Sequence, residues 1–375
     1  MQMLRIDRRL IKNFDWVTLS LILLLSLAGV MTIFSATRPP VSDEMPSYYI
    51  KQSYWLIFSL IALTASVSFD YVWLRRFSYI LYGLGLFLLL CVLFLGRTGM
   101  GAQRWLNLGI LSFQPSEVFK LFYLIAVSHY LSERRGRVGF ISLFKTFFLL
   151  AFIPLLMIIK QPDLSTAVIL LAIFLSIIAA KGLQKKVAVM IILIGLVSVP
   201  FLGHIFWEGL KDYQKNRLVA FLEPEIDPSG IGYHINQSKV AIGSGQFLGK
   251  GYLNGTQGPL RFLPERHTDF IFSIFAEEWG FAGSLLLLLI YLTFILRGID
   301  TARKAKDEFG RLLAIGISFM FTAYFFINIG MTLGIMPVVG IPLPFMSYGG
   351  TALLTNFIAT GMLINIRMRR FELFY

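Results

Sequence analysis

Ten long apolar runs constrain this chain more than any other feature of its sequence. A helix needs about 20 apolar residues to cross the hydrocarbon core of a bilayer. The runs lie at about residues 16–35, 50–69, 78–96, 116–132, 146–160, 164–180, 187–206, 270–296, 312–335 and 348–366. Backbone polar groups find no water in the bilayer, so helices are the economical structure for such runs. We therefore expect an all-α polytopic membrane protein with about ten transmembrane helices, the weakest being the short run that contains Pro154.

The composition argues against several other classes of protein. Of the 375 residues, 56% are hydrophobic and 15% are charged, whereas soluble domains carry about 25% charged residues. The net charge of +13 could suggest a nucleic-acid partner, but the basic residues stand in short clusters between apolar runs, which is the pattern of membrane orientation. The single cysteine, Cys91, excludes an intrachain disulfide framework. We expect membrane lipid, and no nucleic acid, around this chain.

The distribution of Lys and Arg predicts which loops face the cytoplasm. With the N-terminus inside, the inside segments hold 21 of the 34 basic residues. Both termini are then cytoplasmic, and residues 1–375 form one integral membrane domain. The basic residues before the first apolar run mimic a signal peptide. That run is longer than the apolar core of a signal peptide, so we interpret it as an uncleaved first helix.

One connection in this topology is far longer than the others. Residues 207–268, in a loop region bounded at 206–269, form a loop of 62 residues between the seventh and eighth helices. The stretch RFLPERHTDFIFSIFAEEWG, residues 261–280, closes this extracytoplasmic loop and opens the eighth helix. Its charges therefore lie at the periplasmic or exterior membrane edge, where they are either an anchor or a working site.

Asp269 has two interpretations that do not exclude each other. Thr268 and Asp269 suit a helix N-cap, because their side chains accept hydrogen bonds from free backbone N–H groups and favour the positive end of the helix dipole. Alternatively, the Asp269 carboxylate acts as a general base, because low-polarity surroundings raise its basicity. Arg266 and His267 beside it would tune that charge or hold an anionic substrate.

Glu277 and Glu278 lie two turns further along the same predicted helix. Carboxylates at that depth are costly, and they usually face a cavity or a cationic partner. We expect a structural ion pair with a neighbouring span.

Further outside connections carry polar groups at the same membrane depth. Glu117 and Lys120 are spaced i,i+3 in FQPSEVFK at the start of the fourth span, so they share a helix face and can pair. Arg104 in GAQRWL and Asp163 in KQPDLST come from two other connections. A structural ion pair is the default interpretation of each group, but scattered structural pairs do not predict convergence at one depth.

The long loop offers ligands of both charges. Lys239 and Arg217 could hold a phosphate through charge. Glu223, Glu225 and Asp227 alternate through two prolines, which suits either a divalent-cation site or a solvated turn. The GSGQFLGKG run lacks the GK[ST] ending of a P-loop and does not follow a predicted strand, so it does not indicate nucleotide binding.

The motifs of this chain resemble those of one protein family. GAQRWL, FQPSE, QPDLST, YHINQSKVAIGSG, LPERHTDFIF and NIGMTLGIMPVVGIPLPFMSYGGTA occur in the order seen in the SEDS proteins (shape, elongation, division and sporulation). The resemblance covers about residues 10–370, and the run 328–352 fits the family signature along its whole length. The short N-terminal tail and the LEPEIDPSGIGYHINQSK loop resemble the elongation members rather than the division members.

The resemblance implies an activity and the residues that carry it. SEDS proteins are similar in function to inverting peptidoglycan glycosyltransferases, which polymerise lipid II at the outer face of the bacterial cytoplasmic membrane, here for cell elongation and rod shape. The family's loop carboxylate, as general base, matches Asp269. Its fourth-span pair and fifth-loop acid match Glu117, Lys120 and Asp163. The implied substrate-binding residues are Arg104, Glu117, Lys120, Asp163, Lys239, Arg266, His267 and Ser347.

Partners follow from the same resemblance. It implies a class B penicillin-binding protein as transpeptidase partner, other membrane proteins of the elongation complex, and lipid II and polyprenyl pyrophosphate as substrate and product. No cofactor is certain, and a divalent cation, Mg or Mn, is a candidate to share the charge of the leaving pyrophosphate.

Two other functions stay open. A lipid II flippase would use the intramembrane Glu117, Lys120, Glu277 and Glu278 to line a headgroup path. A scaffold for the transpeptidase would need none of the outside carboxylates.

Overall fold

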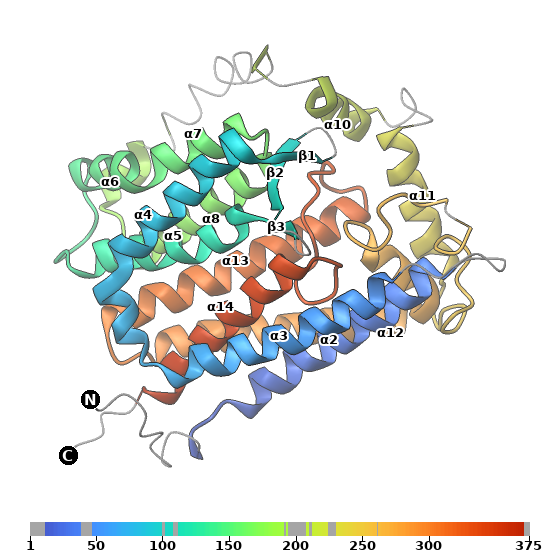
Figure 1. Cartoon of the computed structure of the whole chain (residues 1–375), viewed down its shortest axis with the longest axis horizontal. Coiled ribbons are helices and arrows are strands. Elements are labelled where there is room, and N and C mark those ends of the chain that lie inside the picture. The colour runs from blue at the N-terminus through green and yellow to red at the C-terminus, as the bar shows by residue number, and fades with distance from the viewer. Residues whose placement is uncertain are drawn as a thin grey trace.

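The computed structural model describes residues 12–38, 47–99, 102–107, 112–190, 193, 208–209, 212–223, 230–260 and 262–370. Within these ranges the chain is mostly helical, and its long helices pack side by side in one bundle (Figure 1). The helices are α2 (Trp16–Thr37), α3 (Tyr48–Ser68), α4 (Tyr71–Leu95), α5 (Pro115–Ser132), α6 (Phe140–Thr146), the π-helical turn η1 (Phe147–Phe152), α7 (Ile153–Lys160), α8 (Leu164–Lys181), α10 (Asp212–Leu222), α11 (Ile231–Ser244), α12 (Ile271–Arg303), α13 (Glu308–Thr332) and α14 (Gly350–Met368).

Seven helical stretches of the described chain are long and apolar enough to cross a membrane. They are Trp16–Thr37, Tyr48–Ser68, Tyr71–Leu95, Phe140–Lys160, Leu164–Lys181, Ile271–Arg303 and Glu308–Thr332. The predicted runs at 116–132 and 348–366 are also helices, α5 and α14, although they fall outside this group of seven. The predicted run at 187–206 lies largely outside the described residues. The structure therefore supports a multi-pass helical membrane protein, and the count of ten spans stays a prediction.

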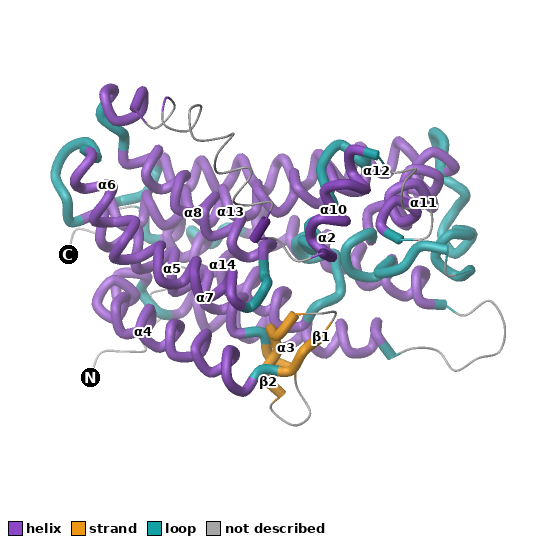
Figure 2. The backbone as a smooth tube through the Cα atoms, turned by 90° about the horizontal axis from the view of Figure 1, so that it is seen from above, coloured by secondary structure: helices purple, strands orange, loops and turns teal. Residues whose placement is uncertain are grey.

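A small antiparallel sheet corrects the expectation of an all-α chain. Strands β1 (Arg97–Gly99), β2 (Ala102–Asn107) and β3 (Ser112–Phe113) follow α4 in the order β1-β2-β3. The connection between α4 and α5 has no apolar run long enough to continue a helix. Its backbone N–H and C=O groups pair between strands instead. The strands lie at the end of α4, and α10 and α11 stand to one side of the helices α4–α8 (Figure 2).

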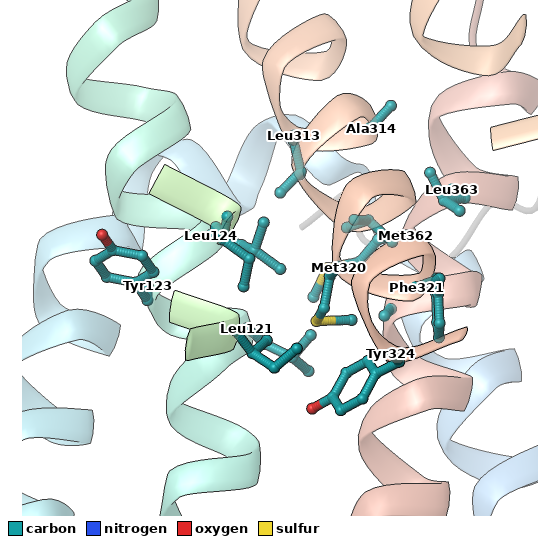
Figure 3. Packing of buried hydrophobic residues seen from close by; sticks show 14 of the residues in the cluster. Leu121, Tyr123, Leu124, Leu313, Ala314, Met320, Phe321, Tyr324, Met362 and Leu363 are labelled. Atoms are coloured by element: carbon teal, nitrogen blue, oxygen red, sulfur yellow. The ribbon is translucent and has the colours of Figure 1, made fainter. Parts of the chain in front are cut away.

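Helix α5 lies at the centre of the bundle, where it contacts α4, α8, α13 and α14. Its Leu124 packs with Leu313 and Met320 of α13, and Met362 of α14 completes this layer of the core (Figure 3). Almost every residue of α5 is buried, including two charged residues in its first two turns. Because protein rather than lipid surrounds α5, this helix can be less apolar than the helices at the surface of the bundle.

The two ends of the bundle differ in their chemistry. At one end, Arg297 pairs with Asp15 at 2.5 Å, and Arg367 pairs with Asp15 at 3.3 Å and with Asp300 at 2.9 Å. This end carries basic clusters that the sequence places in the cytoplasm. At the other end, the starts of α3, α5, α8, α12 and α14 meet the ends of α2, α7 and α13. The candidate site residues gather there.

Candidate active site

Asp269 lies in a tight turn immediately before α12. Glu265 adopts a positive φ of 50°, and its carbonyl oxygen accepts hydrogen bonds from the backbone N–H groups of Thr268, Asp269 and Phe270 at 3.1, 3.1 and 3.3 Å. Helix α12 begins at Ile271 with Phe270 at the N-cap position, and no side chain caps it. The expected cap by Thr268 or Asp269 is therefore wrong. The Asp269 carboxylate therefore does not cap α12.

The backbone around Asp269 is held by two side chains of the segment 328–352. Asn328 donates from Nδ2 to the carbonyl oxygens of Asp269, at 3.0 Å, and of Ile341, at 2.7 Å. Ser347 donates from Oγ to the carbonyl oxygen of Thr268 at 2.6 Å. Ser347 was expected to bind substrate. In the structure its hydroxyl fixes the turn that carries Asp269, and substrate binding by Ser347 stays a prediction.

Asp269 and Arg217 converge on Gly340. A methyl group built on Gly340, whose φ is +76°, would lie 3.2 Å from Oδ2 of Asp269 and 3.5 Å from Nη1 of Arg217. Arg217 extends from α10 and donates from Nη1 to the carbonyl oxygen of Val339 at 3.0 Å. The sequence indicated Arg217 only as one of several phosphate ligands in the long loop. No periodicity of the sequence links a residue of that loop to the segment around Gly340.

The Asp269 carboxylate has the electrostatics of a base that works near neutral pH. Burial raises its pKa from 3.8 to about 6; Glu265 also raises it, while Arg217 and Arg104 lower it. The residue is partly exposed. A carboxylate with such a pKa is mostly ionised at pH 7 and is a stronger base than an ordinary aspartate.

Arg104 and Asp163 form a second polar group beside Asp269. Arg104 on β2 places Nη1 3.7 Å from Oδ1 of Asp163 and donates from Nη2 to the carbonyl oxygen of Pro162 at 2.6 Å. Asp163 is buried at the N-cap of α8, where it accepts hydrogen bonds from the N–H and hydroxyl of Thr166 at 3.1 and 2.8 Å. Arg104 is therefore held in place and still acts on the charge of Asp269.

The predicted pair of Glu117 and Lys120 is confirmed. Nζ of Lys120 lies 2.7 Å from Oε1 of Glu117, and both residues are buried in α5. Lys120 also donates to the hydroxyl of Tyr324 on α13. The three side chains place a cation inside the bundle, at the end where Asp269 lies.

Three other residues that were predicted to bind substrate, Arg266, His267 and Lys239, contact different parts of the protein. Arg266 donates from Nε to the carbonyl oxygen of Ala36 at 2.6 Å, so it caps the end of α2. The ring of His267 lies against the rings of Tyr48 and Tyr348, tilted to both. Lys239 is exposed on α11 and lies over Gly334, just beyond α13. The structure thus brings Arg104, Asp163 and Arg217 towards Asp269, and it places Lys239 elsewhere on the same end.

Glu277 and Glu278 have partners other than those expected. Glu277 is fully buried, and its carboxylate accepts from Nζ of Lys250 at 2.6 Å, from the N–H and hydroxyl of Thr256 at 2.8 Å each, and from the N–H of Gln257 at 3.1 Å. Glu278 is also buried and accepts a hydrogen bond from Ser35 of α2. The cation that pairs with Glu277 therefore comes from the long loop, and not from a neighbouring span.

Helix α12 is interrupted where this loop docks. Gly280 has φ 62° and ψ −164°, which breaks the helical backbone. Residues 246–251 pair with the broken turn through four backbone hydrogen bonds, from Lys250 N to Glu277 O (3.0 Å), Gly251 N to Glu278 O (3.0 Å), Phe281 N to Gln246 O (2.8 Å) and Ala282 N to Phe247 O (3.0 Å). The part of α12 after the break, residues 281–303, is about 34 Å long, enough to cross a core of about 30 Å.

Metal ligands are few in the described part of the chain. No group of three His, Cys, Asp or Glu side chains there could hold a metal ion. Glu225 and Asp227, two of the three acidic residues weighed as a cation site, lie outside the described residues.

These observations define a polytopic helical membrane protein with a polar, partly exposed site at one end of its bundle. The carboxylate of that site is flanked by two guanidinium groups. A sequence model of the FtsW, RodA and SpoVE proteins, described as cell cycle proteins, matches residues 15–372. The chain therefore belongs to this family, the SEDS family that the motifs indicated.

Several members of this family are similar to the chain over most of its length. It is 42% identical over 292 residues to peptidoglycan glycosyltransferase MrdB of Escherichia coli, covering 77% of each protein. It is 30% identical over 436 residues to peptidoglycan glycosyltransferase RodA of Treponema pallidum, covering 96% of this chain and 99% of that one. A probable peptidoglycan glycosyltransferase FtsW of Trichlorobacter lovleyi is 34% identical over 362 residues, covering 94% and 93%.

Two solved structures share the fold. One, from work on the structural coordination of polymerization and crosslinking by a peptidoglycan synthase complex, has a TM-score of 0.81 at 29% identity and covers 96% of this chain and 99% of its own. The rod shape determining protein RodA of Thermus thermophilus has a TM-score of 0.70 at 26% identity and covers 96% and 98%.

Proposed function

We propose that this chain is a peptidoglycan glycosyltransferase that polymerises lipid II for cell elongation, with Asp269 as general base. The observation that carries the proposal is the Asp269 carboxylate, partly exposed, with its pKa raised to about 6 and two arginines beside it. The names of the similar proteins MrdB and RodA support the same activity.

The reaction is an inverting displacement. Asp269 takes the proton from the 4-hydroxyl of an N-acetylglucosamine residue as that oxygen attacks the anomeric carbon of N-acetylmuramic acid on a second lipid-linked molecule. The bond from that carbon to the pyrophosphate breaks, and polyprenyl pyrophosphate leaves with the electron pair. Asp269 becomes protonated in this step and releases its proton to solvent afterwards.

The leaving group is a polyanion, which explains the cations of the site. Arg217 and Arg104 flank Asp269, and Lys120 lies inside the bundle at the same end. Fixed cations that face the charge developing on the pyrophosphate lower the barrier without reorganisation. A divalent cation, Mg or Mn, stays a candidate to share the charge of the pyrophosphate, although no group of three His, Cys, Asp or Glu side chains in the described residues would hold it.

The site is proposed to face the periplasm or exterior of a bacterial cytoplasmic membrane. It lies at the end of the bundle opposite the paired Arg297 and Arg367, and basic residues favour the cytoplasmic side. Ten spans, cytoplasmic termini and an outside loop at 206–269 fit this orientation. The class B penicillin-binding protein of the elongation complex is the proposed partner, a choice supported by the similarity to a solved peptidoglycan synthase complex.

The test is polymerisation of labelled lipid II by purified protein with its cognate transpeptidase. General-base catalysis contributes about 10²- to 10⁴-fold, so Asp269→Asn should lose nearly all glycan synthesis. Asp300→Asn is the matched control, because this carboxylate lies at the opposite end of the bundle, paired with Arg367. Equal product from folded Asp269→Asn protein would remove Asp269 from the role of base. Translocation of lipid II in liposomes without polymerisation would favour a flippase.

A further inference from the structure

Three aromatic rings from three different segments meet at the turn that carries Asp269. Tyr48 is the first residue of α3, His267 lies in the turn before α12, and Tyr348 lies just before α14. The ring centroids of Tyr48 and His267 are 4.6 Å apart, those of Tyr48 and Tyr348 are 5.1 Å apart, and those of His267 and Tyr348 are 5.7 Å apart. We call these three residues the aromatic cluster.

The aromatic cluster differs from the aromatic core of the bundle in its exposure. All three of its residues are partly exposed, whereas Tyr82 and Tyr291 are buried and donate their hydroxyls to the carbonyl oxygens of Leu150, at 2.8 Å, and Pro344, at 2.5 Å. Within the described residues, no protein group hydrogen-bonds to the hydroxyls or ring nitrogens of the cluster. Rings that serve packing alone bury their edges or satisfy their polar atoms. The polar atoms of the cluster remain open to a ligand.

The aromatic cluster is built into the turn that carries the base. Tyr348 donates from its backbone N–H to the carbonyl oxygen of His267 at 2.9 Å, and Ser347 holds the carbonyl oxygen of Thr268. His267 is two residues from Asp269 in this turn. A ligand on the cluster would therefore be positioned by the same backbone that positions the carboxylate.

Aromatic rings whose hydroxyls or ring nitrogens have no protein partner can bind a sugar. A hexopyranose presents C–H groups on one face, and these carry partial positive charge that matches the negative face of an aromatic ring. The hydroxyls of tyrosine can meet the hydroxyl and acetamido groups at the edge of the sugar. Burial lowers the pKa of His267, so its ring is neutral at pH 7 and is both a donor and an acceptor.

We propose that the aromatic cluster is a saccharide subsite, on which a hexosamine ring of the lipid-linked disaccharide stacks next to Asp269. This inference rests on the proposed function and extends it, because it assigns a binding surface for the sugar itself rather than for the pyrophosphate. Its contribution is to binding, so removal of a ring should weaken the affinity for lipid II and leave the chemical step less affected.

The experiment compares Tyr48→Leu with Tyr48→Phe, and Tyr348→Leu with Tyr348→Phe. The phenylalanines keep the flat ring, and the leucines keep apolar bulk without it. Binding of labelled lipid II is measured in an Asp269→Asn background, where turnover does not interfere, and KM is measured in the otherwise wild-type protein. Each leucine should raise Kd and KM by about 3- to 10-fold, as expected for the loss of one ring stack. Each phenylalanine should stay within about 3-fold of the parent protein.

Two controls separate this subsite from structural damage and from the proposed function. Thermal unfolding should be similar for the leucine and phenylalanine variants, and a Kd unchanged by both leucines would overturn the subsite. A loss of kcat alone, at constant Kd, would also overturn it. By contrast, a fully active Asp269→Asn protein would overturn the proposed base, and that result does not depend on either tyrosine.

Discussion

The proposed base, Asp269, should make this protein less stable near neutral pH. Burial raises the pKa of Asp269 from 3.8 to about 6, which means that the folded state disfavours the ionised carboxylate. The resulting loss of folding stability is absent below pH 3.8, grows as the pH rises towards about 6, and is complete above it. The difference between the two pKa values corresponds to about 3 kcal/mol, and the partial exposure of Asp269 reduces this ceiling to about 1–2 kcal/mol.

Asp269→Asn removes the charge and keeps the shape, so it should stabilise the protein while it abolishes polymerisation. We expect a gain of about 1–2 kcal/mol at pH 7.5, seen as a rise of a few degrees in the midpoint of thermal unfolding in detergent. The gain should shrink below pH 6 and vanish near pH 4, because the wild-type carboxyl group is then neutral as well. Both proteins are measured over this pH range at constant ionic strength.

A second variant tests whether the effect belongs to Asp269 rather than to aspartates in general. Asp163→Asn weakens a carboxylate that accepts two hydrogen bonds from Thr166 at the start of α8, so it should lower the unfolding midpoint at pH 7.5. A lower midpoint for Asp269→Asn at pH 7.5, or a gain of the same size at every pH, would refute the reasoning about the charge of Asp269.

Two further predictions concern the surroundings of the base. Arg217→Gln should move the acid limb of the pH–rate profile to higher pH by about one unit, because Arg217 lowers the pKa of Asp269, and Arg217→Lys should restore it in part. An unchanged acid limb would mean that Arg217 does not act on the base. Gly340→Ala places a methyl group 3.2 Å from Oδ2 of Asp269 at a positive φ, so polymerisation at saturating lipid II should fall at least about 10-fold. Wild-type turnover of that variant would show that the carboxylate has room to move.

The apolar runs predicted most of the helices, because hydrophobic length is a local property of the sequence. The run at 16–35 became Trp16–Thr37, and the run at 164–180 became Leu164–Lys181. The strands around Arg104 were missed, since their pairing depends on partners only a few residues away and gives no long pattern. The break at Gly280 was also missed, because a single glycine in an apolar run has no signature until the loop that docks on it is known.

In the candidate site, local spacing predicted one pair of residues, and contacts between distant segments could not be predicted. The pair of Glu117 and Lys120 followed from helical spacing alone, and the structure confirms it. The approach of Arg217 to Asp269, and the use of Ser347 to hold a backbone carbonyl, depend on segments that meet only in the folded chain. Residue type therefore indicated which groups are costly to bury, and the fold decided which of them meet.

The backbone hydrogen bonds between residues 246–251 and the broken turn of α12 mean that these two segments must evolve together. The loop cannot change its length or register without unpairing the backbone of residues 277–282 and leaving the buried Glu277 without its donors. Recombination between relatives is therefore constrained to exchange the loop and the first twelve residues of α12 together. A chimera joined at Ile271 would separate two halves of one structure, whereas a joint placed beyond Ala282 would keep them intact.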